Sequence, residues 1–243
     1  NIKACKKVAE LDCVDDIYVC QASGDTSLPI GACYYAMWEY LRKNELPCNL
    51  LRPVEKMYLG PEYSNEEINT FIEQEDVVSR YKVEREVSPN AIAGRLAEGQ
   101  IIARCSGRME FGLRALGNRS ILADPREIDT VKRINDAIKF RDFWMPFTPT
   151  ILAGREKDYL VNPKGLLSPH MTMAFESTGL ARRDLAAALH PADFTIRPQI
   201  LEKDSNPDYF AIIEAFEHIT GVSALLNTSF NLHGYPIVNT PED

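Results

Sequence analysis

Residues Ile101–Arg126, with the sequence IIARCSGRMEFGLRALGNRSILADPR, form the stretch around which we expect the fold to be organised. The stretch opens as a short apolar run typical of a strand, breaks at Gly107, and continues as a loop rich in glycine and arginine. Between residues 104 and 119 it holds four arginines and a single carboxylate, in a chain whose formal net charge is −8. Glycine lets backbone N–H groups approach a ligand, and arginine pairs with phosphate or carboxylate oxygens in a planar fork. The loop therefore predicts a site for a phosphorylated or acidic small molecule, with a solvated loop paired to scattered acids as the alternative.

The composition narrows the class of protein. A length of 243 residues fits one large domain or two modest ones, and 45% hydrophobic and 26% charged residues are ordinary for a globular chain. The acidic balance argues against a general nucleic-acid binder, and no apolar run has the length of a membrane span, so we expect neither nucleic acid nor membrane as a partner. None of the six cysteines forms a Cys-x-x-Cys pair, which favours reduced thiols in a cytoplasmic protein over a disulfide framework or a zinc site.

Periodicity and capping residues predict alternating helices and strands, and hence an α/β fold. Residues 46–54 contain two prolines and are typical of a linker. The final Thr-Pro-Glu-Asp resembles a helix start with no helix after it, so we expect a piece of a longer protein. Helices are expected over 1–12, 28–44, 64–75, 88–98, 126–138, 155–160, 177–187 and 209–220. Strands are expected over 17–20, 81–87, 101–105, 120–123, 148–152, 171–176 and 222–226, and 197–199 reads as a loop or edge segment.

Three further segments carry possible chemistry. Residues 227–231 (Asn-Thr-Ser-Phe-Asn) follow an apolar strand, and the ends of strands are where open α/β sheets bind ligands; a turn built from Asx and Ser/Thr motifs is equally compatible. Residues 139–147 place Lys139 and Arg141 before three aromatic residues, a pattern that suits a nucleotide but also a core with cations at its rim. Asp25 stands near a predicted helix start, where capping is its ordinary role.

These residues together resemble a known family. Residues 107–121, 139–149 and 226–238 closely resemble the signatures of the nodulation and antibiotic-tailoring O-carbamoyltransferases. The resemblance covers nearly the whole chain and implies two parts: residues 1–48 as the end of an N-terminal carbamoyl-transfer domain, and residues 49–243 as a YrdC-like domain. The expected architecture is α/β, a YrdC-like twisted mixed sheet with flanking helices, preceded by a small α/β fragment of the partner domain.

The resemblance also implies a reaction and a set of roles. The YrdC-like domain would form carbamoyl adenylate from carbamoyl phosphate and ATP, and the N-terminal domain, mostly absent from this chain, would pass the carbamoyl group to an acceptor hydroxyl with a bound metal, iron. By similarity, Arg114 and Lys139 would be the catalytic contacts to phosphate or carbamoyl groups, and Asp25 would be a metal ligand that binds poorly on its own. Further contacts to the ligands are expected from Arg108, Arg119, Arg141, Asn227, Thr228 and Asn231.

Three positions depart from the family pattern: Met145 replaces an arginine, Leu113 a proline and Tyr235 an acid. They leave open a different way of holding the nucleotide, or a different donor or acceptor. The principal alternative is a non-catalytic YrdC-like module that binds nucleotide or RNA or regulates a partner. An enzyme that uses another acyl phosphate is a third possibility.

Overall fold

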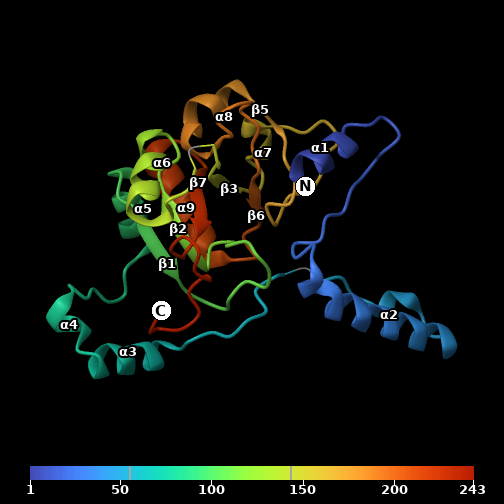
Figure 1. The fold of residues 1–243 in the computed structure, drawn as a ribbon, viewed down its shortest axis with the longest axis horizontal. Coiled ribbons are helices and arrows are strands. Elements are labelled where there is room, and N and C mark those ends of the chain that lie inside the picture. The colour runs from blue at the N-terminus through green and yellow to red at the C-terminus, as the bar shows by residue number, and fades with distance from the viewer. Residues whose placement is uncertain (55, 143) are drawn as a thin grey trace.

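A five-stranded mixed sheet forms the centre of the computed structural model, which describes residues 1–54, 56–142 and 144–243 (Figure 1). Only β3 and β6 pair in parallel, and the other neighbours are antiparallel. The middle strands are covered on both faces, and every residue of β2 and β3 is buried. In spatial order the strands are β1 (Ile102–Cys105), β2 (Arg119–Ala123), β7 (Ala224–Ser229), β3 (Thr148–Leu152) and β6 (Gln199–Leu201).

One face of the sheet packs against two helices. Helix α5 (Pro89–Ala97) begins at Ser88, whose side chain accepts a hydrogen bond from the Ala91 N–H, and α9 (Pro207–Thr220) begins at an Asn206 cap. The two helices lie against each other. Their apolar residues join the strand residues Leu122 and Leu225 in the main core.

The neighbouring strand residues point to the opposite face, as the two-residue period of a strand requires. Ala123 and Leu226 belong to a second, smaller core together with Ile134, Phe147 and Ala187. This face carries α6 (Asp129–Ile134), the π-helical turn η3 (Asn135–Lys139) and η4 (Ala186–Ala188), whereas the buried Ala181 of α8 (Gly179–Asp184) belongs to the main core. The short helix α7 (Glu156–Tyr159) leads into a two-stranded ribbon of β4 (Leu160–Val161) and β5 (Glu176–Ser177).

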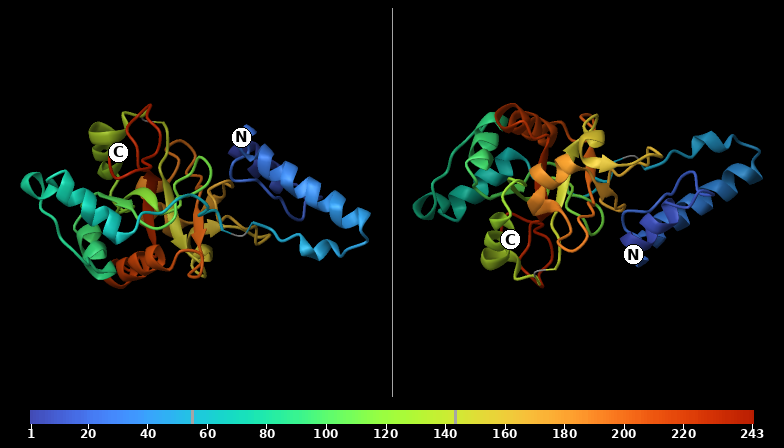
Figure 2. Two further views of the ribbon diagram at one scale, coloured as in Figure 1. Left: turned by 90° about the horizontal axis from the view of Figure 1, so that it is seen from below. Right: turned by 90° about the horizontal axis from the view of Figure 1, so that it is seen from above.

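The N-terminal part is helical. Helix α1 (Ile2–Ala9) is fastened to the main body by Lys164, whose Nζ donates to the carbonyl oxygens of Ala9, Leu11 and Val14 at 2.7 Å each. Helix α2 (Leu28–Lys43) extends away from the sheet, and most of its residues are exposed (Figure 2). The remaining elements here are η1 (Asp25–Ser27), η2 (Cys48–Leu50), α3 (Asn65–Gln74) and α4 (Val77–Arg80).

Most expected elements are present, and the errors share a cause. The predicted strands at 17–20 and 81–87 are coil, because neither segment has a partner strand to complete its hydrogen bonds; Tyr18 is 84% exposed. We expected residues 1–48 to form a small α/β fragment. The expected strand in it was wrong, because the described residues of this segment form only helices and coil. Residues 171–176 contribute one isolated bridge and the start of β5, and residues 199–201 form an edge strand. No helix among the described residues is long and apolar enough to cross a membrane.

Candidate functional site

Three arginines from distant parts of the chain meet at one edge of the sheet. Arg114, Arg141 and Arg197 line a polar pocket of about 50 Å³, together with the end of β7. Each lies in a segment that leads into a strand, respectively β2, β3 and β6. Because β2 and β3 both run antiparallel to β7, and β6 runs parallel to β3, the starts of these three strands lie where β7 ends. The topology thus brings the three guanidinium groups together.

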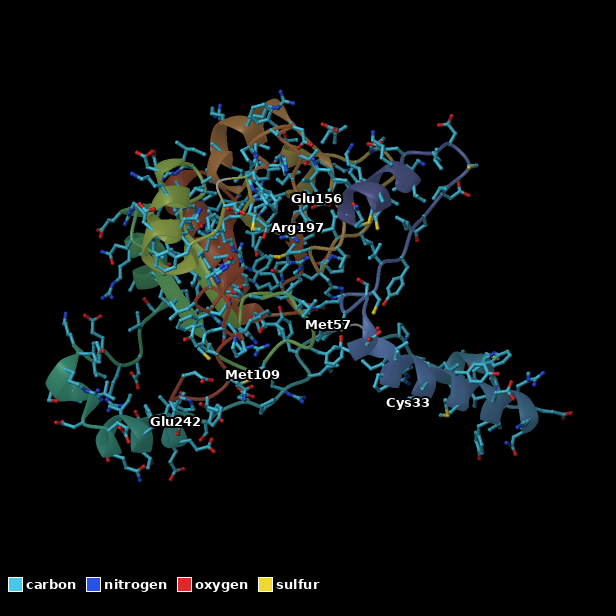
Figure 3. The ribbon with its side chains drawn as sticks, in the orientation of Figure 1. Cys33, Met57, Met109, Glu156, Arg197 and Glu242 are labelled. Carbon is cyan, nitrogen blue, oxygen red and sulfur yellow. The ribbon has the colours of Figure 1, made fainter. Side chains whose placement is uncertain are left out.

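The three guanidinium groups form no ion pair with any carboxylate in the part of the chain that the structure describes. Among the described residues, none of the three makes a hydrogen bond or ion pair; Arg141 packs only over the Phe147 ring, 5.5 Å from its centroid. Burial lowers the pKa of all three, and the charges of Arg114 and Arg141 help to lower the pKa of Arg197 to about 9. Figure 3 shows Arg197 inside the body of the molecule, unlike Cys33 out on α2. Unpaired cations in a partly buried pocket favour an anionic ligand, which would offset their repulsion.

Lys139 lies behind this pocket and holds the end of β7. The helix widens into the π-turn η3, and Phe140 adopts a left-handed conformation at φ 46° that leaves its ring exposed and Lys139 only 1% exposed. The Lys139 Nζ donates to the Ser229 carbonyl, to Ser229 Oγ at 3.2 Å, and to Asn231 O and Oδ1 at 2.9 and 2.7 Å. Burial and the nearby Arg141 lower the pKa of Lys139 to about 7. In this structure the expected catalytic lysine is thus bound to the strand end.

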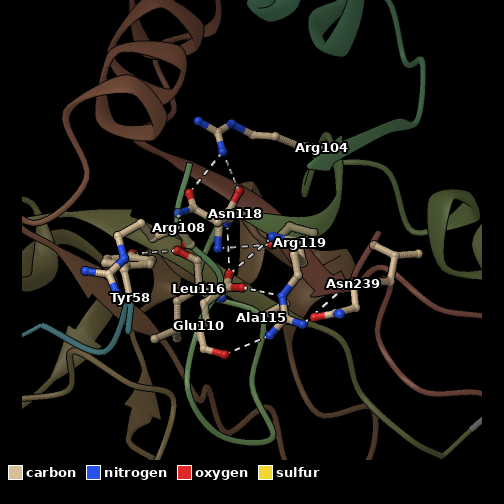
Figure 4. A network of polar contacts seen from close by, with 12 residues as sticks. Tyr58, Arg104, Arg108, Glu110, Ala115, Leu116, Asn118, Arg119 and Asn239 are labelled. Atoms are coloured by element: carbon tan, nitrogen blue, oxygen red, sulfur yellow. Dashed lines mark hydrogen bonds and ion pairs between the residues drawn. The ribbon is translucent and has the colours of Figure 1, made fainter. Parts of the chain in front are cut away.

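Glu110 organises the loop that carries Arg114 (Figure 4). Its side chain is fully buried, and its Oε1 accepts hydrogen bonds from the backbone N–H groups of Leu116, Asn118 and Arg119 at 2.7, 2.8 and 3.2 Å. Its Oε2 pairs with Arg119 Nε at 3.0 Å. The arginine side chain also donates to the Glu110 carbonyl, at 2.7 Å. Arg119 is therefore committed to shaping the loop and lies outside the set that lines the pocket.

Arg108 is likewise engaged elsewhere. Its guanidinium donates to the carbonyls of Leu59 and Gly60 at 2.7 and 3.0 Å and fastens the preceding segment to the loop. The structure thus divides the predicted arginines: Arg114 and Arg141 reach the pocket, whereas Arg108 and Arg119 support it.

The predicted polar run after β7 also divides. Asn227 and Thr228 lie inside the strand and line the pocket, so the expectation that the whole run follows the strand was wrong. Asn227 Nδ2 donates to the Ala115 carbonyl at 3.2 Å, which links the strand to the arginine loop. Asn231 lies beyond the strand. It accepts hydrogen bonds from Lys139, and its side-chain amide donates to the Leu232 and Tyr235 carbonyls, which fixes the following turn.

The structure also locates the proposed metal ligand, Asp25, and the three positions that depart from the family pattern. Asp25 is exposed at the start of η1, and no group of three or more His, Cys, Asp or Glu side chains among the described residues could hold a metal ion, so the residues present do not make a metal site. Met145 lines a cavity adjoining the pocket, and Leu113 stands at the pocket rim, 73% exposed. Tyr235 is exposed, and Phe143 of the predicted aromatic run lies outside the described residues.

Sequence reasoning missed Arg197. The available signal was that Arg197 is the only lysine or arginine between Arg183 and Lys203, placed directly before a proline and an apolar run. A lone cation leading into a short strand was easily read as an edge residue.

Comparison with known proteins identifies the family. The family model described as carbamoyltransferase C-terminus matches residues 93–243. An uncharacterized protein of Methanocaldococcus jannaschii is 39% identical over 94% of this chain and 37% of its own length. Nodulation protein NolO of Bradyrhizobium diazoefficiens is 34% identical over 94% of the chain and 41% of its own length. A 3'-hydroxymethylcephem-O-carbamoyltransferase of Amycolatopsis lactamdurans is 33% identical over 65% of the chain and 29% of its own length.

The chain spans about two fifths of the length of the curated relatives that it matches over nearly its whole sequence. The matched region contains all three arginines of the pocket and the strand that ends beside them. The chain belongs to the carbamoyltransferase family, of which it carries the C-terminal region.

Proposed function

We propose that this chain is the carbamoyl-adenylate-forming part of an ATP-dependent O-carbamoyltransferase, with a YrdC-like domain over residues 49–243. Carbamoyl phosphate and ATP would be its substrates. The family membership supports carbamoyl transfer, and the convergence of Arg114, Arg141 and Arg197 on one polar pocket is the observation that carries the choice of anionic substrates.

The proposed chemistry balances without a protein nucleophile. Water cleaves carbamoyl phosphate to carbamate and inorganic phosphate. A carbamate oxygen then attacks the α-phosphorus of ATP, and the bond to the β-phosphate breaks with release of pyrophosphate. Negative charge accumulates on the phosphoryl oxygens at this step, and fixed guanidinium groups in a partly buried pocket stabilise that charge.

The acceptor hydroxyl would be bound by parts of the protein outside this chain. Asp25 would supply one ligand to a metal whose other ligands lie outside this chain. Within the chain, the Lys139 contacts to Ser229 and Asn231 hold the end of β7 against the three arginines.

Pyrophosphate release from ATP in the presence of carbamoyl phosphate tests the proposal. Arg114→Ala should abolish release while the far-ultraviolet circular dichroism spectrum stays unchanged, because this guanidinium has no structural partner among the described residues. Arg183→Ala is the matched control: that arginine is exposed, pairs with the adjacent Asp184, and should leave the rate unchanged. Full activity of Arg114→Ala would refute the site assignment.

Two further comparisons separate the alternatives. Replacing carbamoyl phosphate by acetyl phosphate distinguishes a carbamoyl-specific enzyme from one that uses another acyl phosphate. Binding of ATP without any pyrophosphate release in the full-length protein would favour a non-catalytic nucleotide-binding module.

A further inference from the structure

The turn that precedes Asp25 packs against the loop that carries Arg114. In this turn Gln21 is 5% exposed and Ala22 is fully buried. A Cβ atom at Gly112 would lie 3.2 Å from Gln21 Cγ, 3.3 Å from Gln21 Nε2 and 3.5 Å from Ala22 Cβ, so a glycine there leaves room for this close approach. Gly112 lies two positions before Arg114. The Gln21 side chain therefore contacts the loop backbone beside an arginine of the pocket.

The amide of Gln21 has unused hydrogen-bonding capacity. Its Oε1 and Nε2 are both buried, and neither has a hydrogen-bond partner among the described residues. A carboxamide has an acceptor oxygen and two N–H donors, and leaving such groups unpaired in a protein interior costs free energy. The buried amide of Gln199, by contrast, donates to the Leu116 carbonyl at 3.1 Å and accepts from Thr150 Oγ1 at 2.9 Å. Gln21 is thus an exception that packing alone does not explain.

The loop backbone is free where Gln21 contacts it. On one side of the contact the Phe111 N–H donates to a backbone carbonyl at 2.7 Å, and on the other the Leu116 N–H donates to Glu110 Oε1 at 2.7 Å. Between them, the backbone groups of residues 112–114 form no hydrogen bond within the part of the chain that the structure describes. An amide without a partner thus lies against a stretch of backbone that also has none.

We infer that Gln21 is a positioning residue for the arginine pocket: its amide bonds the backbone of residues 112–114 when an anion occupies the pocket, and so holds Arg114 in place. The inference rests on the proposed function, in which the pocket binds phosphate groups. The three guanidinium groups repel one another, so an anion that offsets this repulsion draws Arg114 toward the other two. A peptide group offers an N–H and a carbonyl, and a carboxamide can bond to either, so a small shift of the loop is enough to pair the amide.

The same contact makes the arginine pocket depend on the N-terminal part of the chain. Gln21 lies four positions before Asp25, and the turn between them is closed by the Gly24 N–H, which donates to the Ala22 carbonyl at 2.8 Å. The residues that line the pocket all lie within 113–229. A displacement of the N-terminal turn would therefore remove a support of the pocket without touching its lining.

Replacing Gln21 by methionine separates positioning from packing. Methionine is unbranched and similar in length, so it fills the same space but has no amide. Gln21→Met should raise the melting temperature of the protein alone, because it removes buried polar groups that have no partner. The same variant should weaken the binding of inorganic tripolyphosphate, measured by isothermal titration, by roughly threefold to tenfold, because the bound form loses a hydrogen bond to the loop.

Two further glutamines serve as controls. Gln74→Met lies at the exposed end of α3 and outside the pocket lining, so it should change neither the melting temperature nor the affinity for tripolyphosphate. Gln199→Met should lower the melting temperature, because the amide that it removes is paired. The two buried glutamines should thus change the melting temperature in opposite directions.

The outcomes distinguish this inference from the function on which it rests. Weaker tripolyphosphate binding in Gln21→Met at an equal or higher melting temperature supports the positioning role. Unchanged affinity overturns that role while the arginine pocket stands. A lower melting temperature together with weaker binding also overturns it, because the amide would then be an ordinary structural contact. Failure of the wild type to bind tripolyphosphate at all overturns the pocket itself, and with it the choice of anionic substrates.

Discussion

Replacing Glu110 should damage the protein more than replacing any surface acid, because one buried carboxylate closes the whole arginine loop. In Glu110→Ala, three backbone N–H groups lose their shared acceptor and Arg119, with its side chain 11% exposed, loses its partner. The loop that carries Arg114 would lose its main internal constraint. We therefore expect both stability and anion binding to fall.

The magnitude follows from the contacts. Removing one partner of a buried ion pair costs about 3–5 kcal/mol, because the other charge stays buried and uncompensated. Each backbone N–H that remains buried without an acceptor adds about 1–3 kcal/mol. Glu110→Ala should thus lower the free energy of unfolding by at least about 5 kcal/mol, a large part of the roughly 5–15 kcal/mol that a domain has. Glu110→Gln keeps an oxygen for the N–H groups and should lose about 3 kcal/mol.

Urea denaturation followed by circular dichroism measures these differences. Glu217→Gln is the matched control, because Glu217 pairs with Arg155 at 2.7 Å on the surface and its loss should cost less than about 1 kcal/mol. Equal midpoints for the two glutamine variants would refute the reasoning. A Glu110→Gln protein of wild-type stability would show that the Glu110–Arg119 pair contributes nothing beyond its hydrogen-bonding oxygens.

Two further predictions concern the packing and the titration of the site. Gly117→Ala should lower the free energy of unfolding by more than about 3 kcal/mol in thermal denaturation, because Gly117 has φ +114° and a Cβ there would lie 2.2 Å from a ring carbon of the fully buried Tyr209. Gly154 has φ +86° with open space around it, so Gly154→Ala should cost only about 1 kcal/mol. Similar losses of stability in both variants would disprove the clash. The pKa of Lys139 is lowered to about 7 from 10.5, so between these pH values the unfolded chain binds a proton that the folded chain does not. The unfolding free energy of the wild type, relative to that of Lys139→Met, should therefore rise from pH 7 toward pH 10. Denaturation at several pH values measures this difference, and a difference that falls or stays constant would contradict the burial of this amine.

The sequence was informative where the chemistry is local. The helices expected over 64–75 and 88–98 begin where the sequence places a serine, and the side chains of Ser64 and Ser88 cap them by accepting backbone hydrogen bonds. The Gly- and Arg-rich stretch was readable as a loop, and Arg114 of that loop lines the polar pocket; ligand binding there stays a prediction. The alternating residues 81–87 misled, because a strand needs a partner and the pattern alone does not supply one.

Which of the arginines reach the pocket depends on contacts with other segments of the chain. The carbonyls of Leu59 and Gly60 engage Arg108, and the buried Glu110 engages Arg119, so only Arg114 of these three is left for the pocket. The third member, Arg197, enters through the parallel pairing of β6 with β3, which no local pattern encodes. Spacing along the chain could therefore identify the loop but not the set of residues that acts together.

The arginine pocket exists only when three strands have found their places. Arg114 and Arg197 lie 83 positions apart, and each reaches the pocket through a different strand of the sheet. An anion that binds all three therefore recognises the assembled sheet and has no comparable site in the unfolded chain, so it stabilises the native state by mass action. Higher concentrations of the anion should raise the free energy of opening the sheet edge, and amide hydrogen exchange in β6 should slow as the anion is added.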